Sequence, residues 1–227
     1  IPSGRVQPGE ALGIGMALSG FSVVLLALAT NFVAAGLLAF TIFFYAVIYT
    51  MWLKRWTPQN IVIGGLAGAT PPVIGWAAAS GDLSISTDSA AALAESIFDL
   101  GSLMPWFLLT LIFLWTPPHF WALAIKYRDD YAAASVPMLP AVATLAETAR
   151  KISLYTVVLV ATTLVFAPVA DMGAVYLVAA LVLGGLFGVL ALAIQRDPSE
   201  RTGMRLFSYS ITYMTLLFAA MIVDVLV

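Results

Sequence analysis

The chain has 227 residues, of which 62% are hydrophobic and only 10% are charged, and its mean hydropathy is +1.00. A soluble domain carries about a quarter charged residues, so this chain cannot cover itself with polar surface and must have lipid as its solvent. The sequence therefore predicts an integral membrane protein. Because there is no cysteine, disulfides, thiolate metal sites and a cysteine nucleophile are excluded.

Seven apolar stretches follow one another along the chain, each of about 20 residues, the length that a helix needs to cross roughly 30 Å of hydrocarbon. They are Ala11–Thr30, Phe32–Leu53, Asn60–Ala79, Leu103–Ile125, Ile152–Ala170, Ala174–Ile194 and Leu206–Val227. The sequence lacks the alternating short strands of a membrane barrel. We predict an all-α fold, a polytopic transmembrane helical bundle that forms one domain over residues 1–227.

Charge divides the loops of this bundle into two sides. All lysines and arginines fall on one side: Arg5, Lys54, Arg55, Lys126, Arg128, Arg150, Lys151, Arg196, Arg201 and Arg205. The opposite loops carry no basic residue, only Asp82, Asp88, Glu95, Asp99 and Asp171. The positive-inside rule places the N-terminus and the basic side in the cytoplasm, or in the matrix of an organelle, and the C-terminus outside. We expect a protein of the cell membrane or of the mitochondrial inner membrane.

The segment "IPSGRVQPGE" precedes the first span and places Arg5 at its inner end. Taken alone, it is a turn with one positive anchor. The chain starts at Ile1 rather than Met, and no signal peptide precedes the first span. We therefore expect it to be part of a longer protein.

The second span ends in "YTMWLKRWTPQNIVIGG". Lys54 and Arg55 close this span, and Thr57 and Pro58 have the character of an N-cap and a first helical position for the next one. Asn60 would then lie in the first turn of that helix, beside its free amides. The segment is either an interfacial anchor before a well-capped helix, or an anion site in which two bases face a helix N-terminus.

Two features of the remaining spans bear on packing. Gly64 and Gly68, like Gly184 and Gly188, have the small-xxx-small spacing that lets helices approach closely. The outer loop from Ser80 to about Ser102 is long and polar, and we interpret it as a solvated connector with room for a short surface helix.

The fourth span leads into "TPPHFWALAIKYRDDY". Pro117 and Pro118 should kink this helix and free carbonyls in its inner half. His119, the only histidine of the chain, follows inside the apolar run. It is either a helix-to-helix hydrogen bonder or a contact to a cofactor or substrate, since ionisable groups inside membranes often serve function.

Charged residues crowd the inner end of this span. A helical continuation places Lys126 within one turn of both Asp129 and Asp130, with Arg128 on another side. These charges either neutralise one another at a solvated helix end or form half of a metal site. In the second interpretation the carboxylates bind Mg²⁺ through a diphosphate and the bases hold the remaining phosphate charge.

The last span is rich in hydroxyl groups. We expect these side chains to cross-link helices: Ser208, Tyr209, Ser210, Thr212, Tyr213 and Thr215.

Together these stretches resemble the protohaem IX farnesyltransferase (haem O synthase) family, a branch of the UbiA-type intramembrane prenyltransferase superfamily. The resemblance rests on "PSGRV", "YTMWLKRWTPQNIVIGGLAGATPP", "TPPHFWALAIKYRDDYAAASVPMLP" and "SYSITYMTLLFAA". It covers nearly the whole chain, and "PPHFWALAI…DDY…PMLP" is specific to the haem branch.

The resemblance implies a Mg²⁺-dependent reaction. Farnesyl diphosphate loses its diphosphate, the vinyl group of haem B captures the allylic cation, and water completes the side chain of haem O. Haem B is here a substrate and not a prosthetic group. The lipid bilayer, and haem A synthase or oxidase assembly proteins, are the implied partners, whereas nothing points to nucleic acid.

Site residues follow from the same resemblance. Asp129 and Asp130, with Arg128, match the second aspartate motif, and Lys54 and Arg55 match the basic loop that holds the diphosphate. Arg5 matches the arginine just after the first motif. The full set comprises Asp129, Asp130 and His119 as catalytic residues, Asp129 and Asp130 as metal ligands, and Arg5, Lys54, Arg55, Lys126, Arg128 and Asn60 as diphosphate contacts.

One departure concerns the N-terminus. The superfamily has nine spans, with the first aspartate motif between the second and the third, whereas this sequence has seven. We therefore expect two further spans and that first motif to precede residue 1 in the natural protein.

Three alternatives remain at the level of sequence. A transporter is disfavoured because the charges crowd one face instead of the midplane. A catalytically silent assembly factor is disfavoured by the presence of Asp129 and Asp130. Another UbiA-type enzyme, acting on a quinone precursor or chlorophyllide, is disfavoured by "PPHFWALAI".

Overall fold

The computed structural model describes residues 1, 3–80 and 88–227, and within these residues every regular element is a helix. In the described part of the chain, seven helical segments are long and apolar enough to cross a membrane. They confirm the predicted number of spans and the all-α fold. Asp82 of the outer loop lies outside the described residues.

The first three spans come from six helices. α1 (Pro8–Ala29) is followed by α2 (Phe32–Phe43), which continues as a π-helix, η1 (Phe44–Leu53), and then as α3 (Lys54–Trp56). The third span consists of α4 (Asn60–Ala69) and α5 (Pro71–Ala79). It is interrupted at Thr70, because the two prolines that follow cannot donate to the preceding helix. The outer loop holds the expected surface helix, α6 (Ala90–Phe98).

The rest of the chain forms four long helices and two short ones. They are α7 (Met104–Lys126), α8 (Arg128–Ala133), α9 (Leu139–Val142), α10 (Leu145–Val169), α11 (Ala174–Arg196) and α12 (Glu200–Leu226). α7 is continuous through Pro117 and Pro118. α10 and α12 begin about two turns before their predicted apolar starts, because capped polar turns extend them toward the inner side.

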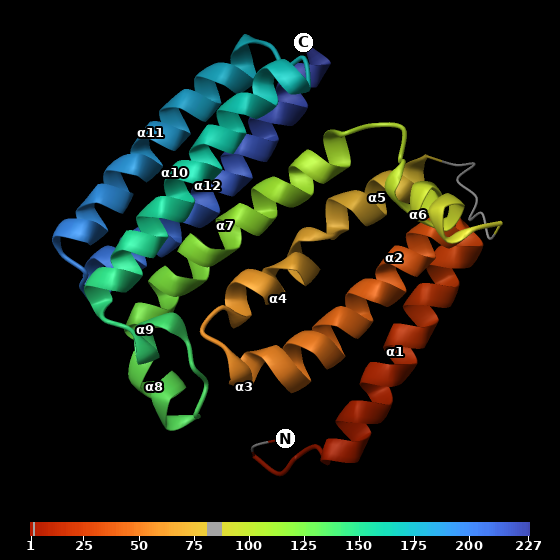
Figure 1. The fold of residues 1–227 in the computed structure, drawn as a ribbon, viewed down its shortest axis with the longest axis horizontal. Helices are drawn as coiled ribbons and strands as arrows, with labels where there is room; N and C mark the ends of the chain where they lie inside the picture. The colour runs from red at the N-terminus through yellow and green to blue at the C-terminus, as the bar shows by residue number, and fades with distance from the viewer. Residues whose placement is uncertain (2, 81–87) are drawn as a thin grey trace.

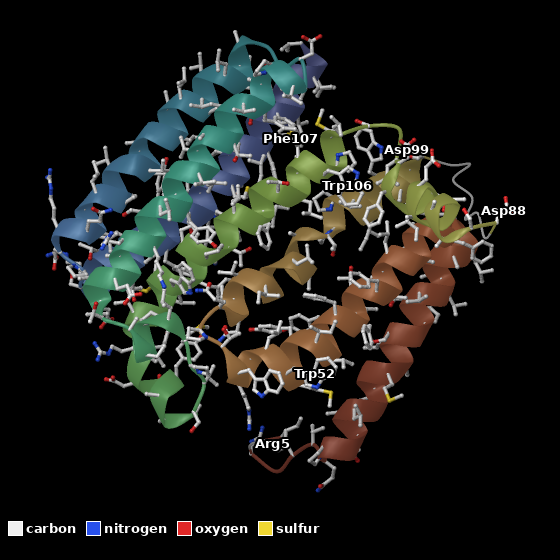
Figure 2. The ribbon with its side chains drawn as sticks, viewed as in Figure 1. Arg5, Trp52, Asp88, Asp99, Trp106 and Phe107 are labelled. Carbon is white, nitrogen blue, oxygen red and sulfur yellow. The ribbon has the colours of Figure 1, made fainter. Side chains whose placement is uncertain are left out.

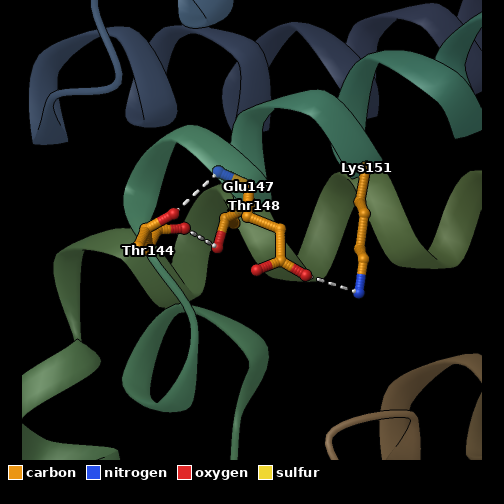
Figure 3. A network of polar contacts seen from close by, with 4 residues as sticks. All are labelled: Thr144, Glu147, Thr148 and Lys151. Atoms are coloured by element: carbon orange, nitrogen blue, oxygen red, sulfur yellow. Dashed lines mark hydrogen bonds and ion pairs between the residues drawn. The ribbon is translucent and has the colours of Figure 1, made fainter.

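The start of α10 shows how such a turn is built (Figure 3). The Thr144 hydroxyl accepts the amide of Glu147 at 3.1 Å, and the Thr148 hydroxyl donates to the Thr144 carbonyl at 3.0 Å. Glu147 then pairs with Lys151 one turn later, at 3.2 Å. These local bonds satisfy the helix end, so α10 extends beyond the apolar segment that the sequence marks.

The main core lies among α7, α10, α11 and α12, which run side by side (Figure 1). Polar side chains cross-link this core. Thr163 and Tyr213 share a hydrogen bond of 2.6 Å between their hydroxyls, and the Tyr176 hydroxyl donates to the Thr163 carbonyl at 2.9 Å. Tyr209 donates to the Leu183 carbonyl at 2.7 Å. Of the hydroxyl-bearing side chains of the last span, Tyr209, Ser210 and Tyr213 thus act as predicted, and Thr212 instead bonds back to its own helix.

Close approach of helices occurs at one glycine of each predicted pair. A Cβ atom at Gly64 would lie 2.2 Å from the ring of Tyr49, and one at Gly184 would lie 2.8 Å from Val160. Gly68 and Gly188 have no atom within 4 Å of such a position. The spacing therefore predicted the contact regions correctly but only half of the contacts.

The first helices are packed more loosely. α1 packs mainly against α2 and buries none of its residues. α2 and α5 share a small second core around Val33 and Val73.

Candidate functional site

The N-terminal segment, α3 and α8 lie at the same end of the bundle (Figure 1). Figure 2 shows Arg5 at this end, below α3. We call this region the inner mouth and define it by Arg5, Lys54, Arg55, Asn60 and the segment 128–130. The structure thus gathers at one end the diphosphate contacts and carboxylates that the sequence analysis named from three separate stretches.

Lys54 and Arg55 lie on α3, the last turn of the second span, and both side chains are exposed. Within the described part of the chain, neither forms an ion pair. Their charges are therefore available to an anion at the mouth.

The predicted cap of the next helix differs from the structure. α4 begins at Asn60, and Gln59 occupies the cap position without a side-chain bond. Thr57 instead accepts the Gln59 amide at 3.2 Å with its hydroxyl, and its carbonyl accepts the backbone and side-chain amides of Asn60, at 3.1 and 2.8 Å. Thr57 therefore closes a turn before the helix, because Pro58 and Gln59 continue that turn rather than α4.

Asn60 is fully buried at the first position of α4. Its side-chain nitrogen is used by Thr57, whereas its Oδ1 atom has no partner among the described residues. A buried polar atom without a hydrogen bond costs about 1–3 kcal/mol. The free group of Asn60 is an acceptor, so it suits a donor or a cation rather than a phosphate oxygen, and a direct diphosphate contact is not what this geometry favours.

Lys126 does not pair with the aspartates. α7 ends at Lys126, Tyr127 has non-helical angles (φ −98°, ψ 20°), and α8 starts afresh at Arg128. The Lys126 ammonium lies 3.6 Å from Glu200 on α12 instead. The expectation of a continuous helix through these residues was wrong, because the chain turns at Tyr127.

Asp129 and Asp130 occupy the first turn of α8 and are exposed. The Arg128 guanidinium approaches Asp129 at 3.4 Å, but the Asp129 side chain remains 96% exposed. No ion pair within the described ranges involves Asp130. Two carboxylates with free oxygens therefore face solvent at the mouth.

His119 is only 8% exposed and joins α7 to α12. Its ring stacks between Trp115 and Phe207, with centroid distances of 4.1 and 4.6 Å. Nδ1 lies 2.7 Å from the Ser210 hydroxyl, whose single hydrogen is directed to the Phe207 carbonyl at 2.6 Å. We therefore assign the ring proton to Nδ1, so that Nε2 is the acceptor nitrogen of the neutral imidazole. The helix-to-helix interpretation of His119 is confirmed, and Nε2 has no hydrogen-bond partner among the described residues.

Sequence reasoning missed a set of tyrosines in η1 and α8. Tyr49 and Tyr45 of η1 pack at a centroid distance of 5.4 Å, and the spacing of four residues was the available signal. Tyr131 follows the aspartates and packs against Ile61 and Met138 of a small core. Burial, and next the hydroxyl of Tyr127, raise the pKa of Tyr131 above its ordinary value, so its hydroxyl stays protonated at neutral pH.

A magnesium ion fits this site only together with a phosphate ligand. Within the described residues no group of three or more acidic or histidine side chains could hold a metal. Mg²⁺ is commonly held by one or two carboxylates plus substrate phosphates, and the free oxygens of Asp129 and Asp130 meet that requirement. These residues therefore fit a metal that arrives with a diphosphate.

The UbiA prenyltransferase family model matches residues 1–220. The chain belongs to the UbiA prenyltransferase family. It is 51% identical over 229 residues to a protein of Rhodopseudomonas palustris named protoheme IX farnesyltransferase, an alignment that covers 99% of this chain and 68% of that protein. Proteins of the same name from Roseobacter denitrificans and Nitrobacter hamburgensis are each 50% identical, over 99% and 100% of this chain and 68% of each relative. No solved structure matches the chain.

Family membership bears on the alternatives. The family match and the helical membrane bundle both favour an enzyme, with its charged mouth at one end of the spans. Every relative named above carries the haem-branch name. A transporter is therefore no longer a competing interpretation.

Proposed function

We propose that the protein transfers a farnesyl group from farnesyl diphosphate to the vinyl group of haem B and so makes haem O for haem-copper oxidases. The observation that carries this function is identity of about one half, over nearly the entire chain, to proteins named protoheme IX farnesyltransferase. The charged inner mouth supports it, because the residues gathered there suit a diphosphate and a metal. We place this mouth on the cytoplasmic or matrix side, as the basic loops favour.

Departure of the diphosphate is the step that the mouth assists. As the bond between the allylic carbon and oxygen breaks, negative charge grows on the leaving group. Lys54, Arg55 and Arg5 would stabilise that charge, because fixed cations favour a transition state in which negative charge develops.

Asp129 and Asp130 would hold Mg²⁺ against the diphosphate. When bound, the metal supplies Lewis-acid stabilisation of the leaving oxygens, worth several kcal/mol. Asp130, which forms no ion pair within the described ranges, is the freer of the two ligands.

The acceptor reacts in the apolar interior. The vinyl carbon of haem B forms a bond to the allylic carbon, and the cation left beside the porphyrin takes the oxygen of water and loses a proton. An interior that excludes bulk water protects the first cation from premature hydrolysis. Nε2 of His119, free and held in orientation by Trp115, Phe207 and Ser210, is a contact for the haem side.

The first experiment measures haem O formation from haem B and farnesyl diphosphate, with Mg²⁺ or EDTA, using the natural full-length protein in liposomes. Asp129→Asn and Asp130→Asn should each lower kcat/KM by about 100-fold or more, because the loss of a metal ligand removes a few kcal/mol of transition-state stabilisation. Glu147→Gln is the matched control, since it removes an inner-side carboxylate that lies on α10 and pairs with Lys151.

One result would contradict the function, and a second would contradict only the proposed metal site. Absence of haem O from well-folded protein would move the assignment to another prenyl acceptor. Full activity of both aspartate variants would remove the metal role from α8 while leaving the reaction itself intact.

A further inference from the structure

An open groove lies along the first turns of α12, at its inner end. It is lined by Glu200, Arg201, Met204, Arg205 and Ser208, none of which belongs to the inner mouth. The apolar part of α12 begins at Leu206, directly after Arg205. The groove therefore lies at the level where lipid headgroups meet the hydrocarbon core of the membrane.

The groove carries net positive charge. Among the described residues that line it, Glu200 is the acidic one, and its carboxylate lies 3.6 Å from the Lys126 ammonium, which offsets its charge. Arg201 and Arg205 are exposed, and neither forms an ion pair within the part of the chain that the structure describes. Two guanidinium groups that are neighbours on one helix are thus left for an anion.

The donors of the groove match a phosphate group in type and spacing. Arg201, Arg205 and Ser208 are separated by steps of four and three residues, so they share one face of α12 within roughly 10 Å along its axis. The Ser208 hydroxyl forms no hydrogen bond to the described residues. Guanidinium groups bind phosphate oxygens through parallel N–H donors, and a hydroxyl can donate to a further oxygen.

The same face of α12 continues into the membrane as an exposed, largely apolar surface. Leu216 and Val223 lie about three and five helical turns beyond Arg205 on the same side, and they are 48% and 47% exposed. Leu216 is roughly 16 Å from Arg205 along the axis, close to the roughly 15 Å of hydrocarbon in one leaflet. A soluble phosphate would use the groove alone, whereas a phospholipid would use the groove and this surface together.

We propose that Arg201, Arg205 and Ser208 bind the headgroup of an anionic phospholipid, whose acyl chains lie along the exposed face of α12. The lipid comes from the leaflet on the basic side of the membrane. Charge selects the headgroup, because a zwitterionic headgroup brings its own cation to the two guanidinium groups and an anionic one does not. The site is separate from the proposed prenyl transfer and does not depend on it.

Arg150 and Arg196 supply a matched control. Both are exposed arginines without an ion pair among the described residues, but they lie on α10 and α11 and do not line the groove. Replacing both by glutamine removes the same charge as Arg201→Gln combined with Arg205→Gln. The comparison therefore separates binding in the groove from the general attraction of a basic surface for anionic lipid.

Native mass spectrometry of the natural full-length protein tests the site without haem or a prenyl donor. Titration with dioleoyl phosphatidylglycerol or dioleoyl phosphatidylcholine gives the affinity for the first bound lipid. The unsubstituted protein should bind the anionic lipid about tenfold more tightly than the zwitterionic one. Arg201→Gln with Arg205→Gln should lower the affinity for the anionic lipid about tenfold, and Arg150→Gln with Arg196→Gln no more than about twofold.

Glu200→Gln should change the affinity in the opposite direction. It removes one negative charge beside the two arginines and releases Lys126 from its ion pair, so the affinity for phosphatidylglycerol should rise about twofold or more. Because misfolding does not produce a gain of binding, this variant is decisive even if the double arginine variant fails to fold.

Glycerol 3-phosphate, which has the phosphate without the acyl chains, separates a lipid from a soluble anion and should compete only weakly. The inference is overturned by equal affinity for the two lipids, by an equal loss in the two double variants, or by the absence of a gain in Glu200→Gln. Full competition by glycerol 3-phosphate would overturn it as well.

Discussion

The two halves of the bundle are built differently. One half consists of α10, α11 and α12, and α7 separates it from the other half. Its large side chains, such as Phe166, Phe187 and Tyr213, are completely buried. On the other side of α7, α1 buries nothing, and α2 and the α4–α5 span enclose a cavity. The spans of both halves are strongly apolar, with mean hydropathies of 1.5–2.2 for the first three and 1.8–2.7 for α10, α11 and α12, so hydrophobicity alone does not distinguish them.

The difference lies in what fills the space between helices. The packed half joins its helices through buried hydroxyl bonds such as that between Thr163 and Tyr213. The open half leaves the Oδ1 atom of Asn60 without a partner, and the charged residues of α3 meet no counter-ion within the described ranges. Within the described residues, one half is therefore closely packed, and the other contains the cavity and the unpaired polar and charged groups.

The largest effect on stability is expected in the packed half, from Gly203→Ala. A Cβ at Gly203 would lie 2.9 Å from the backbone carbonyl of Ala122, and backbone cannot rotate away. Separating α12 from α7 should cost about 1–3 kcal/mol, as overpacking does elsewhere. Thermal unfolding in detergent micelles measures it.

Gly188→Ala on α11 is the control for this substitution, because no atom lies within 4 Å of the new Cβ. It should be neutral or stabilising by up to about 1 kcal/mol, the difference in helix propensity. Equal stability of the two variants would show that α7 and α12 are not closely packed at Gly203.

In the open half, Gly64→Ala should act on turnover more than on stability. A Cβ there would lie 2.2 Å from the Tyr49 ring, which must therefore move. Because misplacement of groups around a reacting centre by about 1 Å can cost up to 100-fold, we expect a loss of about tenfold in haem O formation. The measurement is specific activity of folded protein, and Gly68→Ala, which meets no atom, should retain it.

If Gly64→Ala lost as much stability as Gly203→Ala and kept normal activity, the contrast between the two halves would be contradicted. It would mean that the open half is packed as rigidly as the other.

The smallest effect is expected from Tyr213→Phe, which removes only the hydroxyl that meets Thr163. Hydrogen bonds between membrane helices contribute about 0.6 kcal/mol on average. A double-mutant cycle with Thr163→Val separates the coupling energy of the two hydroxyls from the other effects of each substitution. A coupling energy near zero would show that packing alone, without the buried hydroxyls, distinguishes this half.

Much of the fold was predictable because long apolar runs have few alternatives in a membrane. The seven spans follow from length and hydropathy, and the inner mouth follows from the positions of the bases. The turn at Tyr127 was not predictable from spacing, since helix propensity favoured continuation and only packing of α8 and α9 against α7 decides otherwise. The same holds for the partner of Lys126, which is Glu200 on a helix remote in sequence.

For the site, residue identity was predictable and orientation was not. The contact of His119 Nδ1 with Ser210 at 2.7 Å shows its helix-to-helix role, whereas a contact to a cofactor or substrate stays a prediction. Asn60 was expected to contact diphosphate, but its donor is used by Thr57. That two further spans and a first aspartate motif precede residue 1 stays a prediction, as does the metal role of Asp129 and Asp130.

The π-helix at Phe44–Leu53 affects the direction of Lys54 and Arg55, which follow it directly. A π-helix closes its bonds one residue further along the chain than an α-helix does, so it holds an extra residue within the same span. Deleting one residue there would let the segment wind as an ordinary α-helix, and the residues that follow would keep nearly the same direction. A deletion in α2, which is already an α-helix, would instead rotate Lys54 and Arg55 by about 100° about the helix axis. The π-helix is thus the one part of this span where the residue count can change without redirecting its basic end.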